Sequence, residues 1–137
     1  MEGLGRVFNV LNVADGVAVN LKGYGAVTFV GQLDAGDTFT VTESDALAGS
    51  YAALTTITQF YTAAKAGTGV WSKTTQAAAS TVVTASSIVC AFTISAEELS
   101  DGKSFLKCTS TSTGTVVAIL HDLHHQRTPA NLPAVSA

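Results

Sequence analysis

Apolar and polar residues alternate with a period of two along most of this chain, and this alternation restricts what the chain can fold into. In the clearest stretch, Phe39 and Val41 point to one side of a strand, whereas Thr38, Thr40 and Thr42 point to the other. Similar patterns predict further strands over residues 6–13, 17–21, 25–33, 70–73, 80–84, 87–94, 104–108 and 115–121. The sequence therefore predicts an all-β chain.

Short polar segments separate these strands. Residues 34–37 and 109–114 predict two hairpin connections, because they are rich in acids, glycine, serine and threonine. Residues 51–64 predict a strand that runs into an irregular segment, and residues 76–79 predict a loop. The sequence Ser95-Ala96-Glu97-Glu98 has the pattern of a capping box, which predicts one helical turn between strands.

The chain has 137 residues, which favours one domain. We expect a single-domain antiparallel β-sandwich or jelly-roll-like barrel over residues 1–123, with at most one or two short helical turns. Residues 124–137 lack periodicity and contain both prolines, so they predict an extended C-terminal arm. Residues 1–6 are a second candidate arm.

Charge is scarce in this sequence. Hydrophobic residues make up 47% and charged residues only 12%, about half of the usual ~25%. The net charge of −3 argues against nucleic acid as a main partner. We expect no membrane span, because no apolar run reaches ~18 residues, and no signal peptide, because an acid stands near the start. Such a chain is expected to pack against another protein.

The two cysteines lie in apolar strand patterns. Cys90 and Cys108 favour two buried thiols that act as small hydrophobic side chains. A cross-strand disulfide is the alternative. Neither cysteine belongs to a CxxC or Cys/His metal motif.

All three histidines, His121, His124 and His125, lie within five residues. On a strand, His121 and His125 share a face but lie about 13 Å apart, too far to bind one metal ion. A helical turn would bring the three together, but the prolines that follow argue against one. We therefore favour a polar strand end. A pH-sensitive contact with a partner is a further option, because histidine changes charge near pH ~6.5.

No stretch of the sequence predicts catalysis. The phosphate-binding and nucleophile-elbow motifs are missing, and most acids fall in predicted turns or caps. Trp71 with Tyr51 and Tyr61 could form a sugar-stacking platform, but packing in the core or at an interface is favoured. We expect no enzyme, no catalytic residue, no cofactor and no metal.

The terminal segments are the predicted partner-binding elements, because extended arms can add to a neighbour's sheet or lie in a neighbour's groove. The candidate partner-binding residues are Arg6, His124, His125, Arg127, Pro129, Asn131, Leu132 and Pro133.

Four stretches carry a resemblance to a known class of protein: residues 23–30, residues 39–51, residues 99–123 and the tail at 126–133. Together they make the chain similar to capsid decoration (head cement) proteins of tailed bacteriophages. None of the four is a catalytic signature, and no active-site residue is carried over.

This resemblance implies a non-enzymatic virion protein, made in the host bacterial cytoplasm, that binds the major capsid protein on the capsid exterior in many copies and stabilises the shell. A dimer or trimer of the chain is compatible with it. The alternative within the virion is a tail or neck (head–tail connector) component. A carbohydrate-binding β-sandwich is a third reading.

Overall fold

The computed structural model describes residues 9–13, 16–111, 115–125, 132 and 134. Within them the chain forms eleven β-strands and one turn of 3-10 helix, η1. The elements are β1 (Asn9–Asn12), β2 (Ala18–Asn20), β3 (Tyr24–Gln32), β4 (Asp37–Ser44), β5 (Ala52–Ala53), β6 (Ile57–Ala64), β7 (Ser72–Ala79), β8 (Thr81–Thr84), β9 (Ile88–Ser95), η1 (Ala96–Glu98), β10 (Phe105–Ser110) and β11 (Thr115–Leu123).

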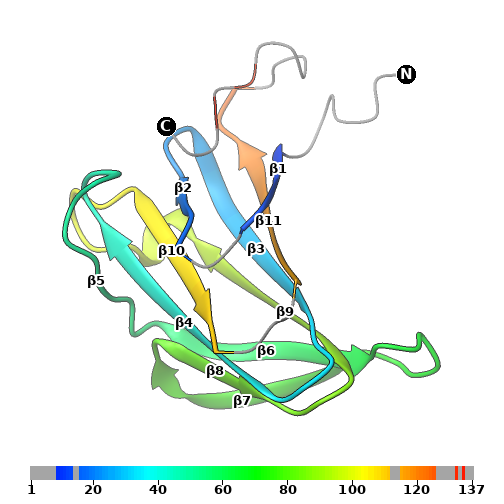
Figure 1. Cartoon of the computed structure of the whole chain (residues 1–137). Helices are drawn as coiled ribbons and strands as arrows, with labels where there is room; N and C mark the ends of the chain where they lie inside the picture. The colour runs from blue at the N-terminus through cyan, green and yellow to red at the C-terminus, as the bar shows by residue number, and fades with distance from the viewer. Residues whose placement is uncertain (1–8, 14–15, 112–114, 126–131, 133, 135–137) are drawn as a thin grey trace, which may run out of the picture.

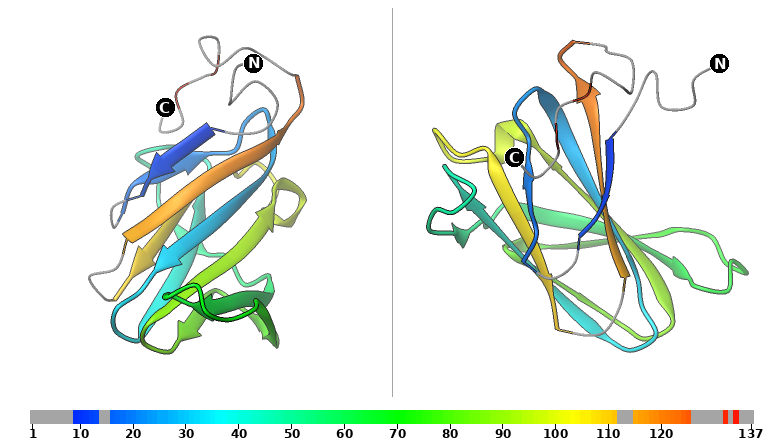
Figure 2. Two further views of the ribbon diagram at one scale, coloured as in Figure 1. Left: turned by 90° about the vertical axis from the view of Figure 1, so that its right-hand side faces the viewer. Right: turned by 45° about the horizontal axis from the view of Figure 1, so that its top comes forward.

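Two antiparallel sheets pack against each other (Figures 1 and 2). The six-stranded sheet has the order β1-β11-β3-β9-β6-β7, and the five-stranded sheet has the order β2-β10-β4-β5 with β8 also paired to β4. The predicted all-β sandwich is thus confirmed. Most of the predicted arm at 124–137 lies outside the described residues, so the arm stays a prediction.

Consecutive strands mostly belong to different sheets, and this corrects both predicted hairpins. β3 lies in the six-stranded sheet and β4 in the five-stranded sheet, so the connection at 33–36 crosses between the sheets. β10 and β11 are likewise in different sheets. Turn residues permit a sharp change of direction, but they do not decide whether the second strand pairs beside the first or packs across the core from it.

The core fills the space between the two sheets. Phe92 in β9 lies 5.5 Å from Phe29 in β3 and 5.9 Å from Phe39 in β4, measured between ring centroids. Cys90 and Cys108 are buried in this core and form no disulfide, which confirms the predicted thiols. The disulfide alternative is wrong because the two cysteines lie on strands of different sheets, not on neighbouring strands.

β7 corrects the loop that was predicted at residues 76–79, because the strand continues to Ala79. Its pairing with β6 is interrupted by a bulge near Ile57. There the Gln76 side-chain amide donates to the Ile57 carbonyl at 3.1 Å and to the Thr81 carbonyl at 2.8 Å. The Gln76 side chain thus replaces ladder bonds that the bulge removes, which keeps a polar, alanine-rich segment in the sheet.

The predicted capping box is confirmed. The Glu98 carboxylate accepts from the Ser95 backbone N–H at 2.7 Å, and the Ser95 hydroxyl accepts from the backbone of the turn. This turn is η1, and it directly follows β9.

Candidate binding surface

Outward side chains of the six-stranded sheet form several rows that cross its strands, and two neighbouring rows are mostly apolar. The strand register places one row from β1 through β11 and β3 to β9, and the second from β11 through β3 and β9 to β6. We call these eight side chains the apolar outer face: Val10, Ile119, Thr28 and Thr93 in the first row, and Val117, Val30, Ala91 and Tyr61 in the second. The second of these rows continues to exposed Asn12 of β1 at one end and to Lys73 of β7 at the other.

None of these eight side chains is charged. Val10 and Tyr61 are 44% and 40% exposed, and Val30, at the centre, is half-buried. Lys73, which faces Tyr61 from β7, marks one margin of the face. An exposed sheet face of this composition is typical of a surface that another protein covers.

The outer face of the five-stranded sheet has a different chemistry. Thr38, Thr40 and Thr42 of β4 point outward there, as the alternation predicted. Beside them the Lys107 ammonium lies 3.9 Å from the centre of the Tyr51 ring. The two outer faces therefore differ in charge: the apolar outer face holds no charged side chain, whereas the other holds Lys107 together with the threonines and Val83, which is 65% exposed.

Two exposed aromatic side chains lie at the β6–β7 hairpin, which extends away from the rest of the sandwich (Figure 1). Trp71, just before β7, is 53% exposed, and Tyr61 of β6 is 40% exposed. Tyr51 packs under Lys107 on the other sheet, so the platform of three aromatics, the less favoured of the two expectations, does not form. The hairpin adds an aromatic end to the apolar outer face, and aromatic side chains are enriched at protein interfaces.

His121 belongs to a hydrogen-bond network at the edge of the apolar outer face. Its Nε2 lies 2.9 Å from the Thr28 hydroxyl, which lies 2.8 Å from the Thr93 hydroxyl. Its Nδ1 lies 2.9 Å from a carboxylate oxygen of Asp122. We call these four side chains the His121 network.

The backbone at Asp122 makes this network possible. Neighbouring side chains of a strand normally point to opposite faces, but Asp122 has a left-handed φ of 56°, which brings its carboxylate beside His121. Gly25 on the adjacent strand leaves the space: a Cβ there would lie 2.9 Å from the Asp122 Cβ. The sequence shows no motif for this arrangement, because it depends on a register between distant strands.

In the His121 network the imidazole lies between a hydroxyl and a carboxylate, as the histidine of a hydrolase triad does. The backbone around the hydroxyl differs from that of a triad. Thr28 lies in β3, whose backbone is paired on both sides with β11 and β9. Its neighbouring N–H groups are therefore used by the sheet and do not converge on a developing oxyanion. The network orients the Thr28 and Thr93 hydroxyls, but the backbone beside Thr28 offers no oxyanion hole for acyl transfer.

The other predicted site residues do not join the network. His124 and His125 are exposed beyond the end of β11, and Leu132 is half-buried. In the part of the chain that the structure describes, no three His, Cys, Asp or Glu side chains gather as metal ligands. Arg6, Arg127, Pro129, Asn131 and Pro133 lie outside the described residues.

Two carboxylates that were predicted to lie in a turn and at a strand end are buried instead. Glu43 is 4% exposed, and its carboxylate accepts from the Ser100 backbone N–H at 3.0 Å and from the Ser100 hydroxyl. Asp37 is 3% exposed and accepts from the Ser110 hydroxyl and, at 2.8 Å, from the Thr111 backbone N–H. Burial alone would raise the pKa of Asp37, but these hydrogen bonds together hold it below its usual value. Both carboxylates tie connecting segments to β4.

Comparison of the chain with protein-family models, with curated proteins and with solved structures finds no match. Among the described residues no helix has the length and apolar character needed to cross a membrane.

Proposed function

We propose that this chain is a non-enzymatic structural protein of a tailed-bacteriophage virion, which binds the outer surface of the capsid in many copies and stabilises the shell. The observation that carries this proposal is the apolar outer face, an uncharged surface across five strands. The four stretches of sequence that resemble decoration proteins give the proposal its partner, the major capsid protein.

The size of the face bears on how such a protein would attach. Neighbouring strands lie about 4.8 Å apart and residues on the same face of a strand lie about 6.8 Å apart, so the eight side chains of the face cover about 260 Å². A stable interface buries about 800 Å² on each partner. One copy would therefore bind weakly through this face alone, and firm attachment needs a second contact, for which residues 124–137 are the predicted element.

Stabilisation of the shell follows from mass action. A protein that binds the assembled shell but not the separated subunits shifts the equilibrium toward the assembled state. Because each bound copy adds to this shift, even weak binding stabilises a shell that carries many copies.

The experiment is sedimentation of the purified protein with capsid shells that lack it. Val30→Asp places a charge at the centre of the apolar outer face, and Thr40→Asp places the same charge on the outer face of the other sheet. We expect the wild-type protein and Thr40→Asp to sediment with shells and Val30→Asp to stay in the supernatant, with all three folded by circular dichroism. Failure of the wild-type protein to bind shells would contradict the proposal.

Carbohydrate binding is the second candidate, and exposed Trp71 and Tyr61 favour it, because sugars stack on exposed aromatic rings. Titration with soluble glycans, followed by Trp71 fluorescence, separates the two functions. A change that saturates and is lost in Tyr61→Ala would favour sugar binding, whereas the capsid proposal predicts no change.

A further inference from the structure

Thr93 ends the His121 network on the side of the apolar outer face. It is exposed, and it lies in the first row of the apolar outer face, opposite Thr28. Within that row Val10 and Ile119 offer no hydrogen-bonding group. Whether the Thr93 hydroxyl points its proton toward Thr28 or toward solvent therefore decides whether this part of the face accepts or donates a hydrogen bond.

The network determines that direction. The Asp122 carboxylate only accepts, so neutral His121 carries its proton on Nδ1 and its Nε2 accepts. Thr28 must then donate to Nε2, and Thr93 must donate to Thr28. With its proton used inward, Thr93 presents only lone pairs to a partner.

Protonation of His121 reverses the sequence of donors. Nε2 then donates to Thr28, Thr28 donates to Thr93, and the proton of Thr93 turns outward. The same hydroxyl thus changes from an acceptor to a donor, and a positive charge appears beside an uncharged face.

We infer that Thr93 is a polar contact of the apolar outer face and that His121 sets whether it accepts or donates, so that attachment weakens on acidification. This inference rests on the proposed function. It specifies the partner surface as an uncharged apolar patch of the capsid shell with one hydrogen-bond donor opposite Thr93. An apolar occupant is favoured because a charged partner surface would lose its hydration against this face without gaining a compensating charge.

A second copy of the chain fits the face less well. The area of about 260 Å² is well below the area that a stable dimer buries on each copy.

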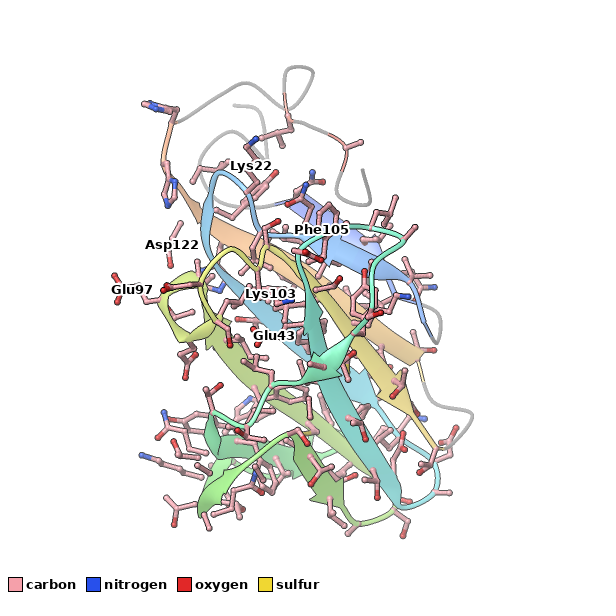
Figure 3. The ribbon with its side chains drawn as sticks, turned by 90° about the vertical axis from the view of Figure 1, so that its left-hand side faces the viewer. Lys22, Glu43, Glu97, Lys103, Phe105 and Asp122 are labelled. Carbon is pink, nitrogen blue, oxygen red and sulfur yellow. The ribbon has the colours of Figure 1, made fainter. Side chains whose placement is uncertain are left out.

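The charged groups near His121 come from its own strand and from η1. Asp122 is its direct partner, and η1, which packs against β3, contributes Glu97 and Glu98. Figure 3 shows Asp122 and Glu97 on the same side of the molecule. β3 and β9 face His121 with the uncharged side chains of Ala26, Thr28, Thr93 and Ser95. Carboxylates ordinarily stay ionised between pH ~5.5 and ~7.5, whereas histidine changes charge there.

The test measures binding of the full chain to capsid shells near pH ~7.5 and ~5.5. We expect the wild-type protein to bind at least about 5-fold more weakly at the lower pH, the equivalent of one lost hydrogen bond. His121→Gln, whose amide oxygen can still accept from Thr28, should bind equally at both. A variant that changes both His124 and His125 to Gln should keep the pH dependence.

Thr93→Val tests the contact itself. At the higher pH it should bind about 2- to 12-fold more weakly than the wild-type protein, whereas the matched control Thr42→Val, on the other sheet, should not. Equal loss in both variants, or equal wild-type binding at both pH values, would overturn the inference and leave the proposed function intact. No wild-type binding at either pH would refute the proposed function and the inference with it.

The network has a readout that does not depend on a partner. Long-range proton–nitrogen NMR of the free protein near pH ~7.5 should show neutral His121 with its proton on Nδ1. A proton on Nε2 would require Thr28 to accept rather than donate, and it would overturn the inference even if shells bind.

Discussion

Replacing Gly31 with alanine tests the packing between the two sheets. Gly31 lies in β3 and faces the core, directly opposite the ring of Phe39 from β4. A Cβ at this position would lie 2.5 Å from Cζ of Phe39 and 3.2 Å from its Cε1. The two sheets can approach this closely only because residue 31 has no side chain.

The structure gives the size of the effect. The Phe39 ring is 1% exposed and is held on another side by Phe92, 5.9 Å away between centroids, so it has little room to move. Overpacking of a tight core costs about 1–3 kcal/mol. We expect Gly31→Ala to lower the free energy of unfolding by that amount, even though alanine reduces the freedom of the unfolded chain.

The assay is urea unfolding followed by far-ultraviolet circular dichroism. The matched control is Gly69→Ala, whose Cβ would meet only the Ala64 Cβ at 3.8 Å, and it should change stability by less than about 1 kcal/mol. Adding Phe39→Leu should relieve the clash, so that the double variant is more stable than the sum of the single changes by about 0.5–3 kcal/mol. Equal stability of Gly31→Ala and Gly69→Ala would refute this account of the core.

Three further measurements test other features. Glu43→Ala removes the carboxylate that accepts from Ser100 and should lower the free energy of unfolding in urea by about 1.5–3 kcal/mol. In the control Glu97→Ala, at an exposed position, the loss should be less than about 1 kcal/mol. Equal losses in the two variants would contradict the role of the buried carboxylate. The pKa of Asp37 is lowered in the folded state, so ionised Asp37 stabilises the fold above its ordinary pKa of 3.8, and this stabilisation is lost as the pH falls through the lower folded value. The unfolding midpoint should therefore fall steeply on acidification in the wild-type protein and less in Asp37→Asn. Equal slopes in the two proteins would count against this role of Asp37. Both cysteines are buried, and burial raises the pKa of Cys90 to about 12. A thiol reagent at pH ~8 should therefore leave Cys90 and Cys108 unlabelled in the folded protein and label both in denaturant. Rapid labelling of the folded protein would contradict their burial.

The sequence predicts the strands well because alternation is a local property. The outward threonines of β4 and the buried Phe39 and Val41 follow directly from the pattern. The same pattern already places Asp37 and Glu43 on the core face, since they share the parity of Phe39. Their burial was missed because acids at strand ends are usually exposed.

The partner of each strand could not be read from the same pattern. The connection after β3 has the residues of a hairpin, yet it crosses between sheets, because pairing depends on contacts with β10 that are distant in sequence. The His121 network depends on registers of this kind among β11, β3 and β9.

Part of the apolar outer face is visible in the sequence of two strands. In β9 the outward positions Val89 and Ala91 are apolar, and in β11 so are Val117 and Ile119, so parts of these strands are apolar on both sides. A strand with two apolar faces is expected either between two layers or at a surface that a partner covers.

The most direct test of the central claim is the number of copies per virion, measured by quantitative mass spectrometry on heads and tails separated from purified particles. Capsid decoration predicts copies on the order of hundreds, confined to heads and in a fixed ratio to the major capsid protein, as a symmetric shell requires. About six to twelve copies in the tail or neck fraction would indicate a closed ring instead, and absence from the particles would contradict a structural role in the virion.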